Sequence, residues 1–145
     1  MTKVLLKKLD PSVELPAYKT NGASGMDLMA FIKDPINLKP HKSCLVPTGI
    51  SVAFHEDFEI QIRPRSGLAA KNNIGVLNTP GTIDSDYRGE IKVILYNHGN
   101  NDFLINNKDR IAQMVLTPVF KMNLEETDSL PETVRGEGGF GSTGK

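Results

Sequence analysis

Glycine and proline interrupt this sequence along almost its whole length, and their spacing constrains the fold more than any other feature. The 145 residues contain 13 glycines and 9 prolines. Because these residues end helices and mark turns, long helices have little room and short strands joined by turns are favoured. Between the turn signals, Phe58–Arg63 and Ile50–Phe54 alternate apolar and polar residues with the period of a half-buried strand.

Two further stretches predict strands that are covered on both faces. Apolar residues occupy nearly every position of Ile91–Tyr96, and Met114–Leu116 is an uninterrupted apolar run. The best helical candidate is the short stretch Leu68–Lys71, for which Ser66 would act as the N-cap. The sequence therefore predicts an all-β fold, a barrel or jelly roll, with one short helix.

The end of the chain has a different composition. Residues 135–145 are glycine-rich and cannot pack a core of their own, so we expect one domain over 1–134 followed by a flexible, mobile lid segment. This segment contains G-x-G-x-x-G and most of a P-loop motif, but both need a helix after the glycines and the sequence stops four residues later. The alternative is a disordered solvated tail. The isolated ring of Phe140 favours a lid over a planar, phosphorylated ligand.

Charge and cysteine content exclude several classes of protein. Lysine plus arginine and aspartate plus glutamate each number 17, so the net charge is zero, which argues against a generally basic nucleic-acid binder. The single cysteine, Cys44, excludes an internal disulfide framework and a cysteine zinc cluster. No apolar run approaches the ~20 residues that span a bilayer. We expect a cytoplasmic protein with neither a membrane nor a nucleic-acid partner.

Four polar segments carry candidate chemistry, each with a plainer alternative. Arg63–Lys71 places three cations and a hydroxyl around a turn, which suits an anion site or a helix cap with solvated charges. Gly81–Glu90 contains two acids, a tyrosine and an arginine in a short stretch. One of the carboxylates could act as a general base for hydrolysis; the alternative is that the whole segment is a polar hairpin. Asp27, among small residues, could equally be a structural acid. Arg110 and Gln113 stand at the start of a buried strand, or at a strand edge.

The order of these segments is more specific than any one of them, and it resembles the five-motif pattern of the trimeric dUTP pyrophosphatases (dUTPases). The matching segments are, in order, Ser24–Leu28, Pro64–Ala69, Gly81–Gly89, Arg110–Gln113 and Arg135–Gly144. The third and fifth are the most specific. The resemblance covers the chain from about residue 9 to its end; Ser24 stands where the family often has alanine.

The resemblance implies both a fold and a reaction. The fold would be a distorted jelly-roll β-barrel that forms a homotrimer, with each active site assembled from three subunits. The reaction would be the Mg²⁺-dependent hydrolysis of dUTP to dUMP and pyrophosphate, with the metal carried on the substrate triphosphate. Such an enzyme limits uracil incorporation into DNA and supplies dUMP for thymidylate synthesis.

The third motif would supply the reacting and nucleoside-binding groups. By resemblance, Asp84 orients the water that attacks the α-phosphate, and the ring of Tyr87 packs against deoxyribose. Asn78 would read uracil together with backbone groups of the hairpin around Gly81. The choice of Asp84 over Asp86 rests on the resemblance alone, because strand alternation would put both carboxylates on one face.

The remaining motifs would hold the triphosphate and the metal. By resemblance, the phosphate contacts are Arg65, Ser66, Gly67 and Gln113. Asp27 would act on Mg²⁺ through water. In the tail, Phe140 beside Gly141 would stack on uracil, and the groups that reach the γ-phosphate would be Arg135, Ser142 and Thr143.

Three alternatives compete with this enzyme. A deaminase acting on dCTP would share the fold but needs a pocket for the cytosine amino group, and Asn78 and the complete tail favour uracil. A catalytically idle nucleotide-binding regulator is disfavoured by the intact Asp84, Tyr87 and Phe140. An all-β nucleic-acid binder would need a basic excess and an aromatic platform, whereas aromatic residues are only 6% of this chain.

Overall fold

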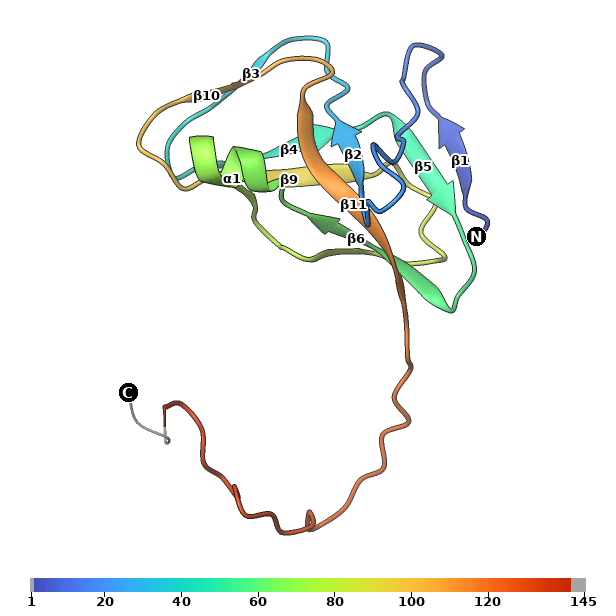
Figure 1. Cartoon of the computed structure of the whole chain (residues 1–145), viewed down its shortest axis with the longest axis vertical. Helices are drawn as coiled ribbons and strands as arrows, with labels where there is room; N and C mark the ends of the chain where they lie inside the picture. The colour runs from blue at the N-terminus through green and yellow to red at the C-terminus, as the bar shows by residue number, and fades with distance from the viewer. Residues whose placement is uncertain (1, 142–145) are drawn as a thin grey trace.

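A computed structural model of the protein describes residues 2–141, which form short antiparallel strands and a short helix (Figure 1). The strands are β1 (Leu5–Lys8), β2 (Met26–Met29), β3 (Ile36–Leu38), β4 (Ser43–Pro47), β5 (Ile50–Ala53), β6 (Phe58–Arg63), β7 (Ile74–Val76), β8 (Gly81–Ile83), β9 (Lys92–Asn97), β10 (Phe103–Ile105) and β11 (Arg110–Pro118). The helix α1 spans Ser66–Asn72. No helix in this part of the chain is long and apolar enough to cross a lipid bilayer.

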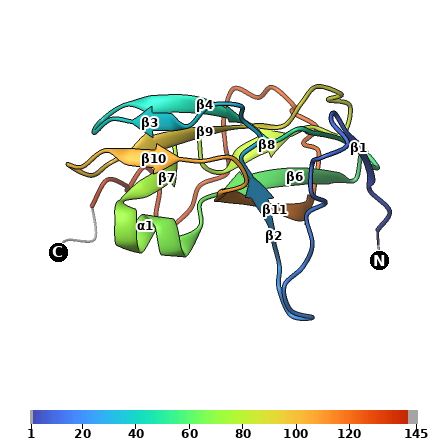
Figure 2. The same ribbon diagram turned by 90° about the horizontal axis from the view of Figure 1, so that it is seen from above.

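The strands form two main antiparallel sheets that face each other. One sheet has the order β2-β11-β6-β8, and the other has the order β4-β9-β7. Two smaller pairs, β1-β5 and β10-β3, extend the layers. Viewed from above, the layer with β4 and β9 lies over the layer with β6 and β11 (Figure 2). Neighbouring strands are distant in sequence, so the chain crosses repeatedly between the layers.

The core lies between these layers. Its fully buried side chains come from many different strands and connections: Leu28, Ile50, Ile74, Ile91, Leu95, Ile105 and Ile111. Burial of one apolar side chain contributes about 1.5–3 kcal/mol, so these residues supply much of the driving force that closes the two layers. The expected all-β, jelly-roll-like fold with one short helix is confirmed.

Two strands expected to be covered on both faces are not fully buried. Val115 of β11 is buried, but its neighbours Met114 and Leu116 are only half-buried. In β9 the outward-facing Ile94 and Tyr96 are likewise half-buried. The expectation of full coverage was wrong, because an apolar composition does not show which side of a sheet receives the second layer. The outer face of β9 leaves apolar surface open to solvent, whereas Met114 and Leu116 lie opposite the buried Ile62 and Ile60 and pack against the core.

The helix α1 begins earlier than the stretch Leu68–Lys71 that the sequence suggested. Its N-cap is Arg65, with an extended backbone (φ −91°, ψ 128°), and no side chain caps the helix. Ser66 is already the first helical residue, so its assignment as the N-cap was wrong. The helix ends at Asn73, which adopts the left-handed conformation (φ 56°) and donates its N–H to the carbonyl oxygen of Ala69 at 3.1 Å.

The chain leaves the barrel after β11. The N–H of Val119 donates to the carbonyl oxygen of Asp57 at 2.8 Å, and Lys121 pairs with Glu56 at 3.6 Å. Beyond this anchor the described residues 122–141 run away from the barrel (Figure 1) and hydrogen-bond only within the tail. One such bond joins Arg135 Nε to the carbonyl oxygen of Gly138 at 2.7 Å.

Candidate active site

Three motifs that are far apart in sequence meet at one end of the four-stranded sheet. The register places Gln113 of β11 opposite Asp27 of β2 on one side and opposite Arg63 of β6 on the other. Arg65, just after β6, reaches back so that its Nε donates to Asp27 Oδ1 at 2.9 Å. Gln113 Nε2 donates to the carbonyl oxygen of Pro64 at 3.0 Å. We call Asp27, Arg65, Arg110 and Gln113 the Asp27 cluster.

Arg110 completes the Asp27 cluster. Its Nη1 lies 3.4 Å from Asp27 Oδ2, and its carbonyl oxygen accepts a hydrogen bond from Arg65 Nη1 at 3.0 Å. The side chains of Asp27 and Arg65 are about four-fifths and three-quarters buried, whereas that of Arg110 is half exposed. Two guanidinium groups share one carboxylate, so the cluster keeps one surplus positive charge. That surplus suits an anionic ligand.

Two features of the Asp27 cluster went unrecognised in the sequence. Arg110 was noted there only as a polar residue at a strand entrance, because its partner Asp27 lies 83 positions away. Gly25 leaves room for Gln113: a Cβ at this position would lie 2.6 Å from Gln113 Oε1. The small residue beside Asp27 was the available signal for this close approach.

Ser66 and Gly67 lie beside the Asp27 cluster, in the first turn of α1. Both are exposed, and no heavy atom lies within 4 Å of the place that a Cβ of Gly67 would occupy. The surface next to Arg65 is therefore open. A phosphate group could approach the helix backbone there without displacing a side chain.

The connection from β7 to β8, which belong to different sheets, places a second group of expected residues together; the hairpin expected around Gly81 is not formed. Gly81 starts β8, and a Cβ on it would lie 3.3 Å from Asn78 Nδ2. The missing side chain thus lets the Asn78 amide lie against the start of β8. The Thr79–Pro80 peptide bond between them is cis, and the N–H of Leu77 bonds to the carbonyl oxygen of Ile94 in β9 at 2.8 Å.

The loop after β8 is folded on itself. The N–H of Tyr87 donates to the carbonyl oxygen of Asp84 at 3.1 Å, which closes a turn. Tyr87 Oη donates to the carbonyl oxygen of Glu90 at 3.0 Å, and Arg88 Nη1 donates to that of Ser85 at 2.6 Å. Glu90 in turn accepts the N–H of Gly49 at 2.9 Å, which ties the loop to the barrel.

The turn separates the two acids that the sequence could not tell apart. β8 ends at Ile83, so strand alternation does not extend to Asp84 and Asp86. Asp84 and Tyr87 line one groove, which we call the Asp84 groove. Its other lining residues are Leu45, Thr82, Ile83, Glu90, Lys92 and Ile94. Asp86 lines a different groove, next to Glu59 and Lys121, to which Asp84 also contributes. Only Asp84 therefore faces the groove that holds the tyrosine.

The Asp27 cluster and the Asp84 groove lie at opposite ends of β6. Ile83, next to Asp84, pairs with Ile60 near the start of β6, whereas Arg65 follows the end of that strand. Asp27 and Gln113 lie level with Arg63, which is three positions from Ile60, or roughly 10 Å along the strand at about 3.3 Å per residue. The described chain therefore brings the expected residues into two groups rather than one.

The tail residues are not close to either group. Arg135 and Phe140 lie in the segment that runs away from the barrel (Figure 1), and Phe140 is fully exposed. Gly141 is the last described residue and has a left-handed backbone (φ 87°). Ser142 and Thr143 lie outside the described residues.

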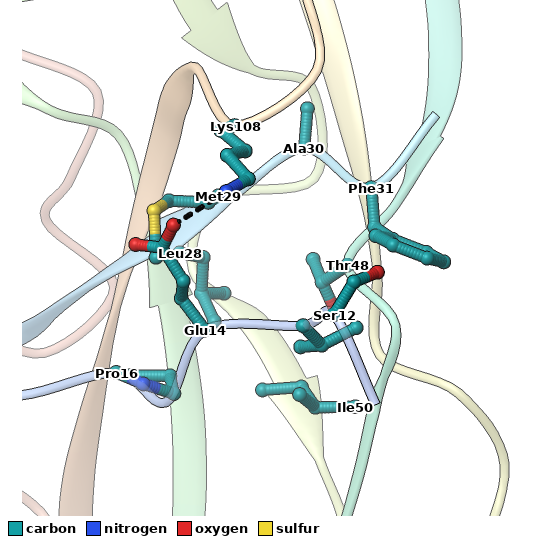
Figure 3. Close-up of a pocket in the computed structure, with 11 residues that line it drawn as sticks. Ser12, Glu14, Pro16, Leu28, Met29, Ala30, Phe31, Thr48, Ile50 and Lys108 are labelled. Atoms are coloured by element: carbon teal, nitrogen blue, oxygen red, sulfur yellow. Dashed lines mark hydrogen bonds and ion pairs between the residues drawn. The ribbon is translucent and has the colours of Figure 1, made fainter. Parts of the chain in front are cut away.

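The small pocket near the N-terminal segment is not a nucleotide site. Its volume of roughly 20 Å³ holds about one water molecule. Lys108 and Glu14 form an ion pair of 2.7 Å beside it (Figure 3). The hydrogen bond and charge of Lys108 hold the pKa of Glu14 below its ordinary value, so this carboxylate is ionised and paired with Lys108.

Residues 2–141 contain neither a cluster of metal ligands nor an activated cysteine. No three histidine, cysteine, aspartate or glutamate side chains there come together as metal ligands. Burial raises the pKa of the half-buried Cys44 thiol, which keeps it protonated and a poor nucleophile. The chemistry of the described chain therefore rests on carboxylates, arginines and a tyrosine.

Known proteins resemble this chain over nearly its full length. The family model "dUTPase" matches residues 12–144. A deoxyuridine 5'-triphosphate nucleotidohydrolase from Treponema denticola is 56% identical over 137 residues, which cover 94% of this chain and 95% of the relative.

Two solved structures share the fold. A mutant of the Staphylococcus bacteriophage 80alpha dUTPase with dUpNHpp has a TM-score of 0.85 at 20% identity, with 100% of both chains covered. A mutant dUTPase from phage phi11 of S. aureus, described with a structural Mg(II) ion, has a TM-score of 0.79 at 17% identity, covering 90% of this chain and 99% of that one. With the family match and the 56% identity, these findings establish that the chain belongs to the dUTPase family.

Proposed function

We propose that the protein hydrolyses dUTP to dUMP and pyrophosphate, with Asp84 orienting the attacking water. The observation that carries the proposal is the state of the Asp84 carboxylate. It is exposed beside Tyr87 in one groove, and no side chain among residues 2–141 is ion-paired or hydrogen-bonded to it. Asp27, in contrast, is held by two arginines. An unpaired carboxylate can accept a hydrogen bond from water and then its proton.

The proposed reaction is a substitution at the α-phosphorus. The water oxygen forms a bond to that phosphorus, and the bond to the oxygen bridging the α- and β-phosphates breaks. Pyrophosphate leaves with that oxygen, and Asp84 takes up the proton of the attacking water. An aspartate is a weak base at neutral pH, so its main contribution would be to hold the water in line with the scissile bond.

Specificity would come from the β7–β8 connection and from the loop after β8. Asn78, held against Gly81, offers an amide with both donor and acceptor atoms, which suits the edge of uracil. The ring of Tyr87 would pack against deoxyribose and leave no space for a 2'-hydroxyl. The relative from Treponema denticola is named for its action on deoxyuridine triphosphate, and the phage 80alpha dUTPase was solved with dUpNHpp.

The triphosphate would bind at the Asp27 cluster of a subunit. The proposed phosphate contacts are Arg65, Ser66, Gly67 and Gln113. The surplus positive charge of the cluster and the open surface beside α1 support this assignment. An arginine that contacts phosphate through two N–H groups gives both affinity and orientation.

The residues present fit a magnesium ion that arrives with the substrate. Mg²⁺ keeps several waters and prefers phosphate oxygens plus one or two carboxylates. Both oxygens of Asp27 already face arginines, so this carboxylate would contact the ion only through water. When bound, the ion would neutralise charge that develops on the phosphates.

The proposal includes a homotrimer with shared active sites. The Asp84 groove and the Asp27 cluster lie toward opposite ends of β6, which supports a shared site to which a second subunit would supply one of the two groups. The tail supports the same conclusion. Phe120, Met122 and Leu124 alternate along it and are 84–91% exposed, as expected of a segment that packs on another chain.

The tail of a third subunit would act as a lid over this shared site. Phe140 would stack on uracil next to Gly141, and the proposed γ-phosphate contacts are Arg135, Ser142 and Thr143. A closed lid with an arginine would exclude water and stabilise the charge of the transition state. The division into a barrel domain and a lid at residues 134 and 135 is part of this proposal.

In a cell, this reaction would limit uracil incorporation into DNA and supply dUMP for thymidylate synthesis. The substrate belongs to the cytoplasmic pool of DNA precursors, and the proposed function needs neither a membrane nor a nucleic-acid partner.

The test is pyrophosphate release with Mg²⁺ from dUTP, dCTP, dTTP and UTP in parallel. Release from dUTP alone would support both the base pocket and the exclusion of a 2'-hydroxyl. Binding of dUTP without release would instead favour a regulatory nucleotide-binding protein. Ammonia formed from dCTP would favour a deaminase.

A further inference from the structure

Gly89, two residues after the tyrosine of the third motif, has a role that the proposed function does not assign. We propose that Gly89 is a positioning residue for specificity: its missing side chain creates the space in which the Tyr87 ring lies. This inference rests on the proposed function, in which that ring packs against deoxyribose. Gly89 touches no substrate itself and would act only through Tyr87.

The evidence is the contact between the Tyr87 ring and the Gly89 backbone. A Cβ on Gly89 would overlap the hydroxyl oxygen of Tyr87 and would lie 2.5 Å from Cζ and 2.8 Å from Cε2. Carbon atoms in ordinary contact are about 3.5–4.0 Å apart. All three nearest atoms belong to Tyr87, so one side chain accounts for the crowding. Even alanine cannot occupy position 89 while the ring keeps its place.

The backbone does not require glycine at this position. The described glycines with positive φ are Gly49, Gly136 and Gly141. Gly89 is not among them, so an alanine there meets no backbone strain. The closest contacts that exclude a side chain at this position come from the tyrosine ring.

One hydrogen bond holds the ring hydroxyl and another holds the Tyr87 backbone, but the ring itself can move toward solvent. Its hydroxyl donates to the carbonyl oxygen of Glu90 at 3.0 Å, and the Tyr87 N–H closes the turn with Asp84 at 3.1 Å. The residue is 44% exposed, so a new Cβ would push the ring toward solvent rather than displace the barrel. Gly89→Ala should therefore fold normally but carry a misplaced ring next to Asp84.

A misplaced ring would weaken discrimination between deoxyribose and ribose. A packed ring excludes a 2'-hydroxyl only if the gap between the ring and the sugar is smaller than one oxygen atom. We expect Gly89→Ala to lower the preference for dUTP over UTP, measured as the ratio of their kcat/KM values, by about tenfold. The KM for dUTP should rise, since the ring contacts the sugar both in the ground state and in the transition state.

The experiment compares Gly89→Ala with Gly22→Ala as the matched control, because no heavy atom lies within 4 Å of a Cβ at Gly22. Steady-state pyrophosphate release gives kcat and KM for dUTP and UTP. In parallel, NMR of protein with labelled tyrosine rings reports the contact between the Tyr87 ring and the α-protons of residue 89; the chain has only three tyrosines. We expect that contact in the wild type, its loss in Gly89→Ala, and an unchanged dUTP preference in Gly22→Ala. An unchanged preference in Gly89→Ala, or equal loss of both activities with a lower melting temperature, would overturn the inference.

A double-mutant cycle shows whether Gly89 acts through the ring. In a Tyr87→Ala background, Gly89→Ala should have no further effect on the dUTP preference, whereas additive effects would refute a role through Tyr87.

The same measurements distinguish failure of this inference from failure of the proposed function. If the wild type releases no pyrophosphate from dUTP, the proposed function and the specificity role both fail, although the ring contact seen by NMR would persist. If the wild type prefers dUTP and Gly89→Ala keeps the same preference, the proposed function stands and this inference alone fails.

Discussion

Replacing Asp27 by asparagine tests whether the Asp27 cluster is held together by its one carboxylate. Asparagine keeps the shape of the side chain and an oxygen that can accept from Arg65 Nε, which lies 2.9 Å from Asp27 Oδ1. The substitution therefore removes charge with little change in packing. Arg65 and Arg110 then face each other without a counter-charge.

The expected loss of stability follows from burial. The side chains of Asp27 and Arg65 are 21% and 25% exposed, so their pair falls between a surface ion pair and a fully buried one. Surface pairs contribute about 0–1 kcal/mol, and breaking a buried pair costs about 3–5 kcal/mol. The Arg110 contact is longer, at 3.4 Å, and the arginine is 52% exposed, so this contact adds little. We expect Asp27→Asn to lower the free energy of unfolding by about 1–2 kcal/mol.

The assay is thermal unfolding followed by circular dichroism at one protein concentration, since assembly makes the melting temperature concentration-dependent. The expected decrease is about 2–8 °C for a chain of this size. Asp102→Asn is the matched control, because Asp102 also pairs with a cation, Lys39, but is 44% exposed. Its melting temperature should fall less.

Activity provides a second measurement on the same variant. Without the charge, Arg65 is held less firmly, by neutral hydrogen bonds alone, so the KM for dUTP should rise and kcat should fall. A melting temperature equal to that of Asp102→Asn, together with unchanged kinetics, would refute the idea that Asp27 holds the cluster. A change confined to the Mg²⁺ dependence would instead assign Asp27 to the metal alone.

Three further outcomes are expected. Asp84→Asn should abolish pyrophosphate release while nucleotide binding and the melting temperature are retained, because no described side chain pairs with this carboxylate; turnover near the parent rate would remove Asp84 from the reaction. Deletion of residues 135–145 should leave a folded trimer, measured by light scattering, with much lower activity. The reason is that the described tail makes no hydrogen bond or ion pair with the barrel beyond Lys121. Unfolding of the truncated chain would contradict the lid role. Hydrogen bonds from Lys39 and Asn37 hold the pKa of Asp102 below its ordinary value of 3.8, so their stabilisation is present above that pH and is lost as the pH falls through the lowered value. Wild type and Asp102→Asn should thus differ in melting temperature at neutral pH and converge in strong acid, and a gap that persists there would count against the pairing.

Local patterns in the sequence were sufficient for the fold class. Alternation in Phe58–Arg63 predicted β6, and the small residues around Leu68–Lys71 predicted α1. Both features depend on neighbours within a few positions, which the sequence displays directly. The family resemblance added the site residues, because it depends on the order of motifs and not on their contacts.

Contacts across the barrel could be read only from the tertiary structure. The sequence could not separate Asp84 from Asp86, because the turn that leaves only Asp84 in the groove of Tyr87 depends on where β8 ends. The contact between Asp27 and Arg110, which are 83 positions apart, depends on the register of β2 against β11. The role of Gly89 depends on the direction of one ring. Periodicity determines which residues form strands and helices, whereas strand pairing and side-chain direction arise from the packing of the whole chain, and only the tertiary structure decides them.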